Sequence, residues 1–177
     1  DAEIKSQLAN SRPYRQWIDR LRVKLESLPA PQSAALTHAS NTFATETPVS
    51  DGERVFAWFG ASGFAVAYDL EGKELWKTEI GAFPNQNGWG TASSPVIHDG
   101  RLFIQSDNEE KSFMVALDAK TGKEIWKSES LGAASTHCTP VLARHGDRNL
   151  VVTNVKSLLA GIDADTGKVL WTHPLAQ

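Results

Sequence analysis

One sequence pattern occurs three times in this chain, and its interval constrains the fold more than any other feature. Each copy contains a small residue, an apolar residue, an aspartate, a short turn with Gly-Lys and a final tryptophan, over residues 67–76, 116–126 and 161–171. The closing tryptophans, Trp76, Trp126 and Trp171, are 50 and 45 residues apart. Self-similarity at this interval is typical of repeat architectures, and four-stranded propeller blades are one of them.

A second marker follows the same interval. Its copies begin 29, 32 and 32 residues before the tryptophans, and they are Thr47-Pro48-Val49, Ser94-Pro95-Val96 and Thr139-Pro140-Val141. Asp51-Gly52 and Asp99-Gly100 follow the first two copies, and Asp-Gly favours a tight hairpin because glycine accepts a positive φ. Each repeat is therefore predicted to form four short strands, which in the middle repeat are residues 94–98, 102–106, 113–118 and 124–128.

The repeats predict a mainly β fold, a partial β-propeller of about three four-stranded antiparallel blades. In the strand at 113–118, apolar side chains alternate onto both faces, as expected for a sheet packed between two neighbours. We expect each tryptophan to pack on the adjacent blade, each small residue to let the next backbone approach, and each aspartate to accept hydrogen bonds from turn amides. This structural docking role is predicted for Ala67, Asp69, Gly72, Trp76, Ala116, Asp118, Gly122, Trp126, Gly161, Asp163, Gly167 and Trp171.

The copy at residues 116–126 resembles the tryptophan-docking motif of the quinoprotein, or pyrroloquinoline quinone (PQQ)-like, β-propeller repeat family. The third copy differs by Gly161 in place of alanine, and the first is one residue shorter and lacks the threonine. The resemblance covers residues 37–177. It implies a bacterial protein in a periplasmic or other extracytoplasmic compartment, in a family that contains both PQQ- and Ca²⁺-carrying dehydrogenases and cofactor-free scaffolds.

The residues argue against the dehydrogenase branch of that family. Many of its alcohol oxidisers hold the quinone against a disulfide between adjacent cysteines, and this chain has a single cysteine, Cys138. The run from Asp107 to Glu110 offers oxygen ligands for Ca²⁺. Four consecutive residues point in different directions, however, so a solvated turn is the preferred interpretation. No PQQ or Ca²⁺ is predicted, and a fragment or subunit of a PQQ/Ca²⁺-dependent dehydrogenase is the alternative.

The loop between the first and second repeats is a candidate binding site. It is polar and aromatic, and Asn85, Asn87 and Trp89 are its candidate residues. Loops at the ends of blades carry many binding functions, although an ordinary connector is the simpler interpretation. The predicted function is therefore a non-catalytic module for binding or scaffolding.

Charge and length limit the partners. The net charge of −3 is dispersed without a basic stripe, which argues against nucleic acid, and no apolar run approaches the roughly 18 residues of a membrane span. Propellers have about four to eight blades, more than the three repeats counted here. Open blade faces predict a protein partner, self-association into an oligomer, or a continuation in a larger chain.

Residues 1–29 differ from the repeats and predict a helical segment of two short helices, followed by a linker at residues 30–36. The apolar stripe from Tyr14 to Leu28 either packs on its own domain or recruits a partner. Part of this segment, residues 3–18, resembles a short stretch of the large subunit of glutamate synthase, without that enzyme's catalytic or iron–sulfur cysteines. A chimeric or recombined sequence without an evolved function is therefore a further alternative.

Overall fold

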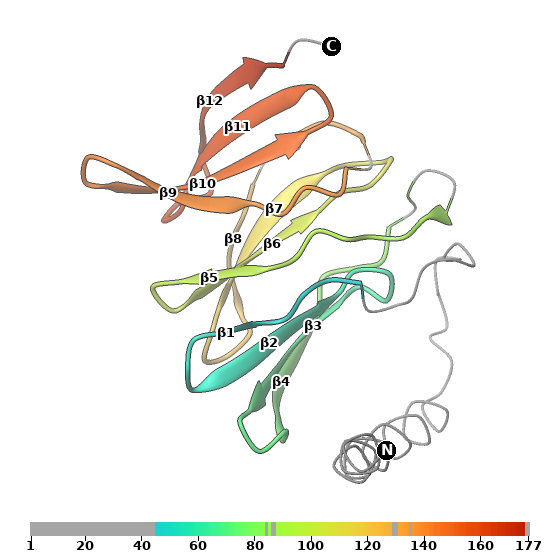
Figure 1. The fold of residues 1–177 in the computed structure, drawn as a ribbon, viewed down its shortest axis with the longest axis vertical. Helices are drawn as coiled ribbons and strands as arrows, with labels where there is room; N and C mark the ends of the chain where they lie inside the picture. Colours follow the sequence, from blue (N-terminus) through green and yellow to red (C-terminus); the bar gives the residue numbers. More distant parts are fainter. Residues whose placement is uncertain (1–44, 84, 86–87, 129–130, 135, 176–177) are drawn as a thin grey trace, which may run out of the picture. The chain divides into compact units, whose positions relative to one another are not determined.

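The described part of the chain contains three four-stranded antiparallel sheets, and within each sheet the strands pair in the order in which they occur in the sequence (Figure 1). The computed structural model describes residues 45–83, 85, 88–128, 131–134 and 136–175. Blade 1 contains β1 (Val49–Ser50), β2 (Arg54–Phe59), β3 (Phe64–Asp69) and β4 (Glu74–Glu79). Blade 2 contains β5 (Val96–His98), β6 (Arg101–Ser106), β7 (Phe113–Asp118) and β8 (Glu124–Lys127). Blade 3 contains β9 (Val141–His145), β10 (Arg148–Val155), β11 (Leu158–Asp163) and β12 (Val169–Pro174).

The mainly β architecture with three four-stranded antiparallel blades is confirmed. The predicted helical segment at residues 1–29, the linker at 30–36 and the stretch that resembles glutamate synthase lie outside the described residues. Among the described residues, no helix is long and apolar enough to cross a membrane.

The hairpin between β5 and β6 forms at the predicted Asp-Gly pair. Asp99 and Gly100 have φ values of 46° and 71°, and two central residues with positive φ are what a two-residue type I′ turn requires. The first strand of this blade starts at Val96, two residues later than predicted. The cause is that the Ser94 N–H donates to Thr139 Oγ1 instead of a ladder partner, and Pro95 has no N–H to donate.

The small residue of each repeat lies directly opposite its tryptophan in the pairing of the last two strands. The pairs are Ala67–Trp76, Ala116–Trp126 and Gly161–Trp171, and the register shifts by one residue immediately after each small residue. At Gly161, a Cβ would lie 2.1 Å from Cε2 of Trp171. This small residue therefore makes room for the tryptophan of its own blade, rather than for the next blade as the sequence suggested.

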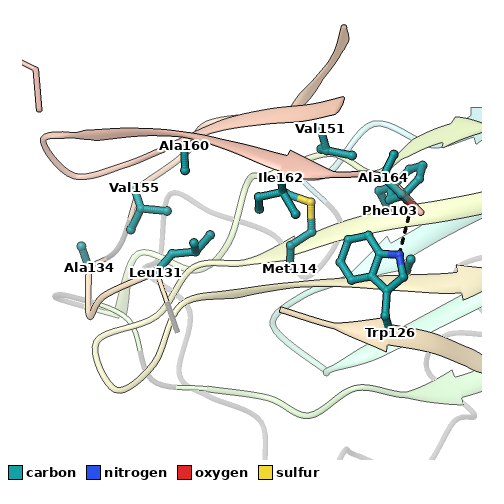
Figure 2. Packing of buried hydrophobic residues seen from close by; sticks show 11 residues of the cluster. Phe103, Met114, Trp126, Leu131, Ala134, Val151, Val155, Ala160, Ile162 and Ala164 are labelled. Atoms are coloured by element: carbon teal, nitrogen blue, oxygen red, sulfur yellow. Dashed lines mark hydrogen bonds between the residues drawn. The ribbon is translucent and has the colours of Figure 1, made fainter. Parts of the chain in front are cut away.

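The apolar side chains divide into two clusters, one at each junction between blades. The alternation in β7 sends Phe113, Val115 and Leu117 into the cluster with blade 1, and Met114 and Ala116 into the cluster with blade 3. Figure 2 shows Met114 within the second of these clusters. Blade 2 is thus covered on both faces, as the two-sided apolar pattern of its third strand predicted. The core of the described part lies between the blades rather than inside any one of them.

Candidate functional site

The tryptophans of the first two blades reach across to the next blade. Trp76 Nε1 donates to the carbonyl of Ala119 over 3.0 Å, and Trp126 Nε1 donates to the carbonyl of Ala164 over 3.1 Å (Figure 2). In both cases the acceptor directly follows the motif aspartate of the next blade. Each indole therefore pairs its only polar atom while its rings exclude water from the junction.

A glycine lies under each of these indole rings. A Cβ at Gly122 would lie 2.6 Å from Cδ2 of Trp76, and one at Gly167 would lie 2.5 Å from Cε3 of Trp126. The two glycines also have positive φ values of 70° and 73°. Glycine is thus required at both positions for two reasons, because φ is positive and because the indole ring leaves no room for a Cβ.

The motif aspartates hold the turns that receive the indoles. Asp118 Oδ1 accepts hydrogen bonds from the N–H of Lys120 and from both the N–H and the hydroxyl of Thr121. The Thr121 side-chain hydrogen bond holds the pKa of Asp118 below its usual value, against a smaller opposing effect of burial. Asp163 makes the same contacts, and Asp69 accepts from two amides in its shorter turn.

Sequence reasoning missed an arginine that begins the second strand of each blade. Arg54, Arg101 and Arg148 recur at intervals of 47 residues, and that spacing was the available signal. Arg54 Nη1 donates to the carbonyl of Ala119 over 3.2 Å, and Arg101 Nη1 lies 2.8 Å from Oδ1 of Asp165. Both arginines thus bind the turn of the next blade, beside the indole contact.

The second sequence marker forms a ladder between the first strands. The N–H of Thr47 donates to Ser94 Oγ over 2.9 Å, and the N–H of Ser94 donates to Thr139 Oγ1 over 3.1 Å. The hydroxyls of the second and third markers, Ser94 and Thr139, therefore each accept a hydrogen bond from the backbone N–H of the marker in the preceding blade, which explains why serine or threonine precedes the proline there.

A buried polar cluster, which we call the Asp107 cluster, joins blades 2 and 3. Gln105 Nε2 donates to both carboxylate oxygens of Asp107 at 2.8 Å, and the Thr136 hydroxyl donates to Oδ2 at 2.5 Å. Thr153 in β10 completes the cluster by donating to Gln105 Oε1. The interpretation of Asp107 as part of a solvated turn is therefore wrong, because its side chain lies between two blades and the residue is only 4% exposed.

The geometry of the Asp107 cluster favours a protonated carboxyl group. The hydroxyl of Thr136 faces two acceptors, Asp107 Oδ2 and the carbonyl of Asn154 at 3.2 Å, but it has one proton to donate. A protonated Asp107 satisfies all three groups, because its O–H donates to Thr136 while Thr136 donates to Asn154. Burial, opposed by hydrogen bonds from Thr136 and Gln105, raises the pKa of Asp107 to about 6.

The junction between blades 1 and 2 has a different carboxyl group in the equivalent place. Gly60, six residues after Arg54, corresponds to Asp107, six residues after Arg101. A Cβ at Gly60 would lie 2.7 Å from Oε1 of Glu46, which accepts a hydrogen bond from Thr91. Burial raises the pKa of Glu46, against several hydrogen bonds that lower it. Each junction thus pairs one buried carboxyl group with one threonine hydroxyl.

The oxygen groups of the run from Asp107 to Glu110, considered above as ligands for Ca²⁺, do not fit a calcium site. Asp107 is occupied in its cluster, and Asn108 Oδ1 accepts hydrogen bonds from the N–H groups of Glu110 and Lys111. Only Glu109 and Glu110 of that run are exposed. Among the residues that the structure describes, no three His, Cys, Asp or Glu side chains come together to hold a metal ion.

The candidate binding loop is described only in part. Asn85 is half-buried and its Oδ1 accepts a hydrogen bond from the N–H of Gly90 over 2.9 Å, so this side chain shapes the loop. Trp89 is exposed, and Asn87 lies outside the described residues.

Stacked four-stranded blades that are joined by tryptophan–carbonyl contacts define a propeller of PQQ-like repeats. The chain belongs to this repeat family, since residues 15–177 match the family model described as outer membrane protein assembly factor BamB. The assignment to the PQQ-like repeat family is thus confirmed, and the resemblance to glutamate synthase is not supported by these matches.

Curated relatives and a solved structure agree with the family. The chain is 37% identical over 79 residues to polyvinylalcohol dehydrogenase of a Pseudomonas species, which covers 36% of this chain and 12% of that protein. It is 33% identical over 94 residues to quinohemoprotein alcohol dehydrogenase ADH IIB of Pseudomonas putida, and this match covers 49% of this chain and 13% of that protein. BamB from Moraxella catarrhalis superposes with a TM-score of 0.57 at 18% identity, over 76% of this chain and 38% of that one, and shows the fold alone.

The contact between glycine and indole is testable with a matched pair of variants. Gly122→Ala combines strain at positive φ with a clash against Trp76, whereas Gly72→Ala has the same strain, at φ 83°, and nothing within 4 Å of the new Cβ. We expect Gly122→Ala to lower the free energy of unfolding by about 2–4 kcal/mol more than Gly72→Ala, measured by urea denaturation of dilute protein. Equal losses would contradict the contact.

The Asp107 cluster predicts a pH dependence of stability. Because the pKa of Asp107 is about 6 in the folded state, and about 3.9 in an unfolded chain, folding takes up a proton between these values. Stability from this group is highest at low pH and falls as the pH rises towards 6. Between pH 4.5 and 7 we expect a loss of about 2 kcal/mol relative to Asp107→Asn, from urea denaturation at each pH. A constant difference between the two proteins over this range would rule out the shift.

Proposed function

We infer that this chain is a non-catalytic segment of a PQQ-like propeller, which acts in protein binding or scaffolding as part of a larger chain or an oligomer. The observation that carries the proposal is that the polar side chains at the junctions bind other parts of the propeller. The motif aspartates hold their own turns, Arg54 and Arg101 bind the turn of the next blade, and the hydroxyls of Ser94 and Thr139 accept hydrogen bonds from the preceding marker, so these polar groups serve the junctions between blades. In this proposal the twelve motif residues are structural docking residues, and the loop with Asn85, Asn87 and Trp89 is a surface for partners.

The family match supports this role. Its model carries the description of an outer membrane assembly factor, which agrees with a scaffolding protein in an extracytoplasmic compartment. The chain spans only 12% and 13% of the two curated relatives named above, so their activities do not transfer with the match. The proposal includes no cofactor, because the run from Asp107 to Glu110 does not fit Ca²⁺.

Two alternatives differ in their support. Identity to quinohemoprotein alcohol dehydrogenase ADH IIB favours a fragment or subunit of a PQQ- and Ca²⁺-dependent dehydrogenase. A chimeric sequence without an evolved function is less well supported. The family match starts at residue 15, before the linker expected at residues 30–36, and this weighs against a recombination junction there.

A thermal unfolding experiment separates the scaffold from the dehydrogenase. The melting temperature of the full chain is measured alone, with Ca²⁺, with PQQ, and with both. A ligand at 100 times its Kd adds about 2.7 kcal/mol of stability, which is several degrees for a chain of this size. We expect the melting temperature with Ca²⁺, with PQQ or with both to equal that of the chain alone. A saturable rise that requires both PQQ and Ca²⁺ would establish the dehydrogenase alternative.

A further inference from the structure

We propose that Asp99 is a site of spontaneous covalent modification, at which its carboxyl group and the backbone nitrogen of Gly100 cyclise and then reopen as isoaspartate. The chain contains two Asp-Gly pairs, Asp51-Gly52 and Asp99-Gly100. Such pairs are susceptible to this reaction, because glycine has no side chain to obstruct the attack on the carboxyl carbon. The contacts of the folded chain protect the first pair and leave the second open.

The reaction needs no reagent other than water. The Gly100 nitrogen attacks Cγ of Asp99, a C–N bond forms, and the carboxyl hydroxyl leaves as water with the amide proton, which gives a cyclic imide. Water then adds to one of the imide carbonyls. Cleavage of the bond between nitrogen and Cγ restores aspartate. Cleavage of the bond between nitrogen and the main-chain carbonyl carbon gives isoaspartate, in which the main chain runs through Cβ and Cγ, and the mass of the chain is unchanged.

The attacking nitrogen is engaged at Gly52 and free at Gly100. The N–H of Gly52 donates to Ser50 Oγ over 3.0 Å. No described residue accepts a hydrogen bond from the N–H of Gly100, which lies at the tip of the hairpin between β5 and β6. Both glycines are exposed, and a Cβ at either would meet nothing within 4 Å. The two sites therefore differ in hydrogen bonding and not in crowding.

The carboxyl group of Asp51 is also held in place. Its Oδ1 accepts hydrogen bonds from the N–H groups of Glu53 and Arg54, over 3.0 and 2.8 Å, and its Oδ2 accepts one from Nη2 of Arg54 over 2.6 Å. Burial by itself raises the pKa of Asp51, but these hydrogen bonds outweigh it and hold the pKa below its usual value. A carboxyl group that is fixed and ionised is a poor target for the amide nitrogen, because a carboxylate does not readily release an oxygen.

The carboxyl group of Asp99 is held more loosely. His98 Nε2 lies 3.2 Å from its Oδ2, and Asn149 Nδ2 donates to the same oxygen over 3.4 Å, which is longer than a typical hydrogen bond. Its Oδ1 has no partner among the described residues. The side chain is 60% exposed, compared with 20% for that of Asp51. Asp99 can therefore turn its carboxyl carbon towards the Gly100 nitrogen and lose only weak, solvent-exposed contacts.

Isoaspartate in place of Asp99 affects both junctions of blade 2. The extra main-chain carbon does not fit the two-residue turn between β5 and β6, so the Gly100 carbonyl is displaced. This carbonyl accepts a hydrogen bond from the N–H of Ala119 over 2.8 Å, and the Ala119 carbonyl in turn accepts the indole N–H of Trp76 from blade 1. On the other side, Asp99 contacts Asn149 of blade 3. The modification therefore loosens the turn that receives Trp76 and removes a contact with blade 3.

The experiment incubates the full folded chain at neutral pH for several weeks. Tryptic digestion and mass spectrometry with electron-transfer fragmentation then locate and quantify isoaspartate at each Asp-Gly pair. We expect isoaspartate to accumulate severalfold faster at Asp99 than at Asp51. In guanidinium chloride, where the contacts are lost, the two sites should react at similar rates. Equal rates in the folded chain, or a folded chain without isoaspartate at Asp99, overturn the proposal.

Two variants test the cause of the difference. Arg54→Ala removes side-chain contacts of the Asp51 carboxyl group, so isoaspartate should also appear at Asp51 while the rate at Asp99 is unchanged. Asp99→Asn keeps the turn, because Asn-Gly favours the same type I′ conformation, and its amide should be lost faster, with a gain in mass. An Asp51 that stays intact in the first variant, or an amide that persists in the second, contradicts the proposal.

The effect on the junctions is measured separately. The free energy of unfolding of the incubated wild-type chain, from urea denaturation, should fall as its content of isoaspartate at Asp99 rises. A free energy that stays constant while isoaspartate accumulates would contradict the link between this hairpin and the junctions of blade 2.

Discussion

The contact of an indole with a glycine and a carbonyl of the next blade is the interaction on which the rest of this structure depends. A four-stranded sheet with two apolar faces gains stability only when both faces are covered. The indole of Trp126 covers one such face, and its N–H satisfies the carbonyl of Ala164 that the junction would otherwise bury unpaired. The aspartate turn, the glycine and the bulge after the small residue all position this one contact.

Stability in such a structure is a property of junctions rather than of blades. The two apolar clusters lie between neighbouring sheets, and the polar groups that bind across the same junctions surround them. Blade 2 is stabilised from both sides, whereas blades 1 and 3 each have one described junction. In repeat proteins of this kind the free energy of folding is approximately a sum of an intrinsic term for each repeat and a term for each interface between neighbours, so the two described junctions carry much of the stability of the described blades.

Features that recur in every repeat could be predicted from the sequence. The three blades, most strand boundaries of the middle repeat and the hydrogen bonds of Asp118 follow from residues that occur at the same place in each copy. Gly161 was interpreted less well, because sequence shows that a small residue is needed but not which side chain presses on it. Asp107 was placed in solvent, since its burial depends on Thr136, which is distant in sequence, and on the approach of blade 3. The binding role of Asn87, the helical segment at residues 1–29 and the linker at residues 30–36 stay predictions, because they lie outside the described residues.

The buried carboxyl groups imply that the repeats, although alike in fold, are not interchangeable parts. In blade 1 the acid is Glu46 and the facing position is Gly60; in blade 2 the acid is Asp107, and Ser93 stands where Glu46 would be. A blade with both acids would force two carboxyl groups into the volume of one, because the Cβ of the second lies within 3 Å of the first. A blade grafted between repeats must therefore bring both positions of its carboxyl pair, since one acid is tolerated at each junction and a second would collide with it.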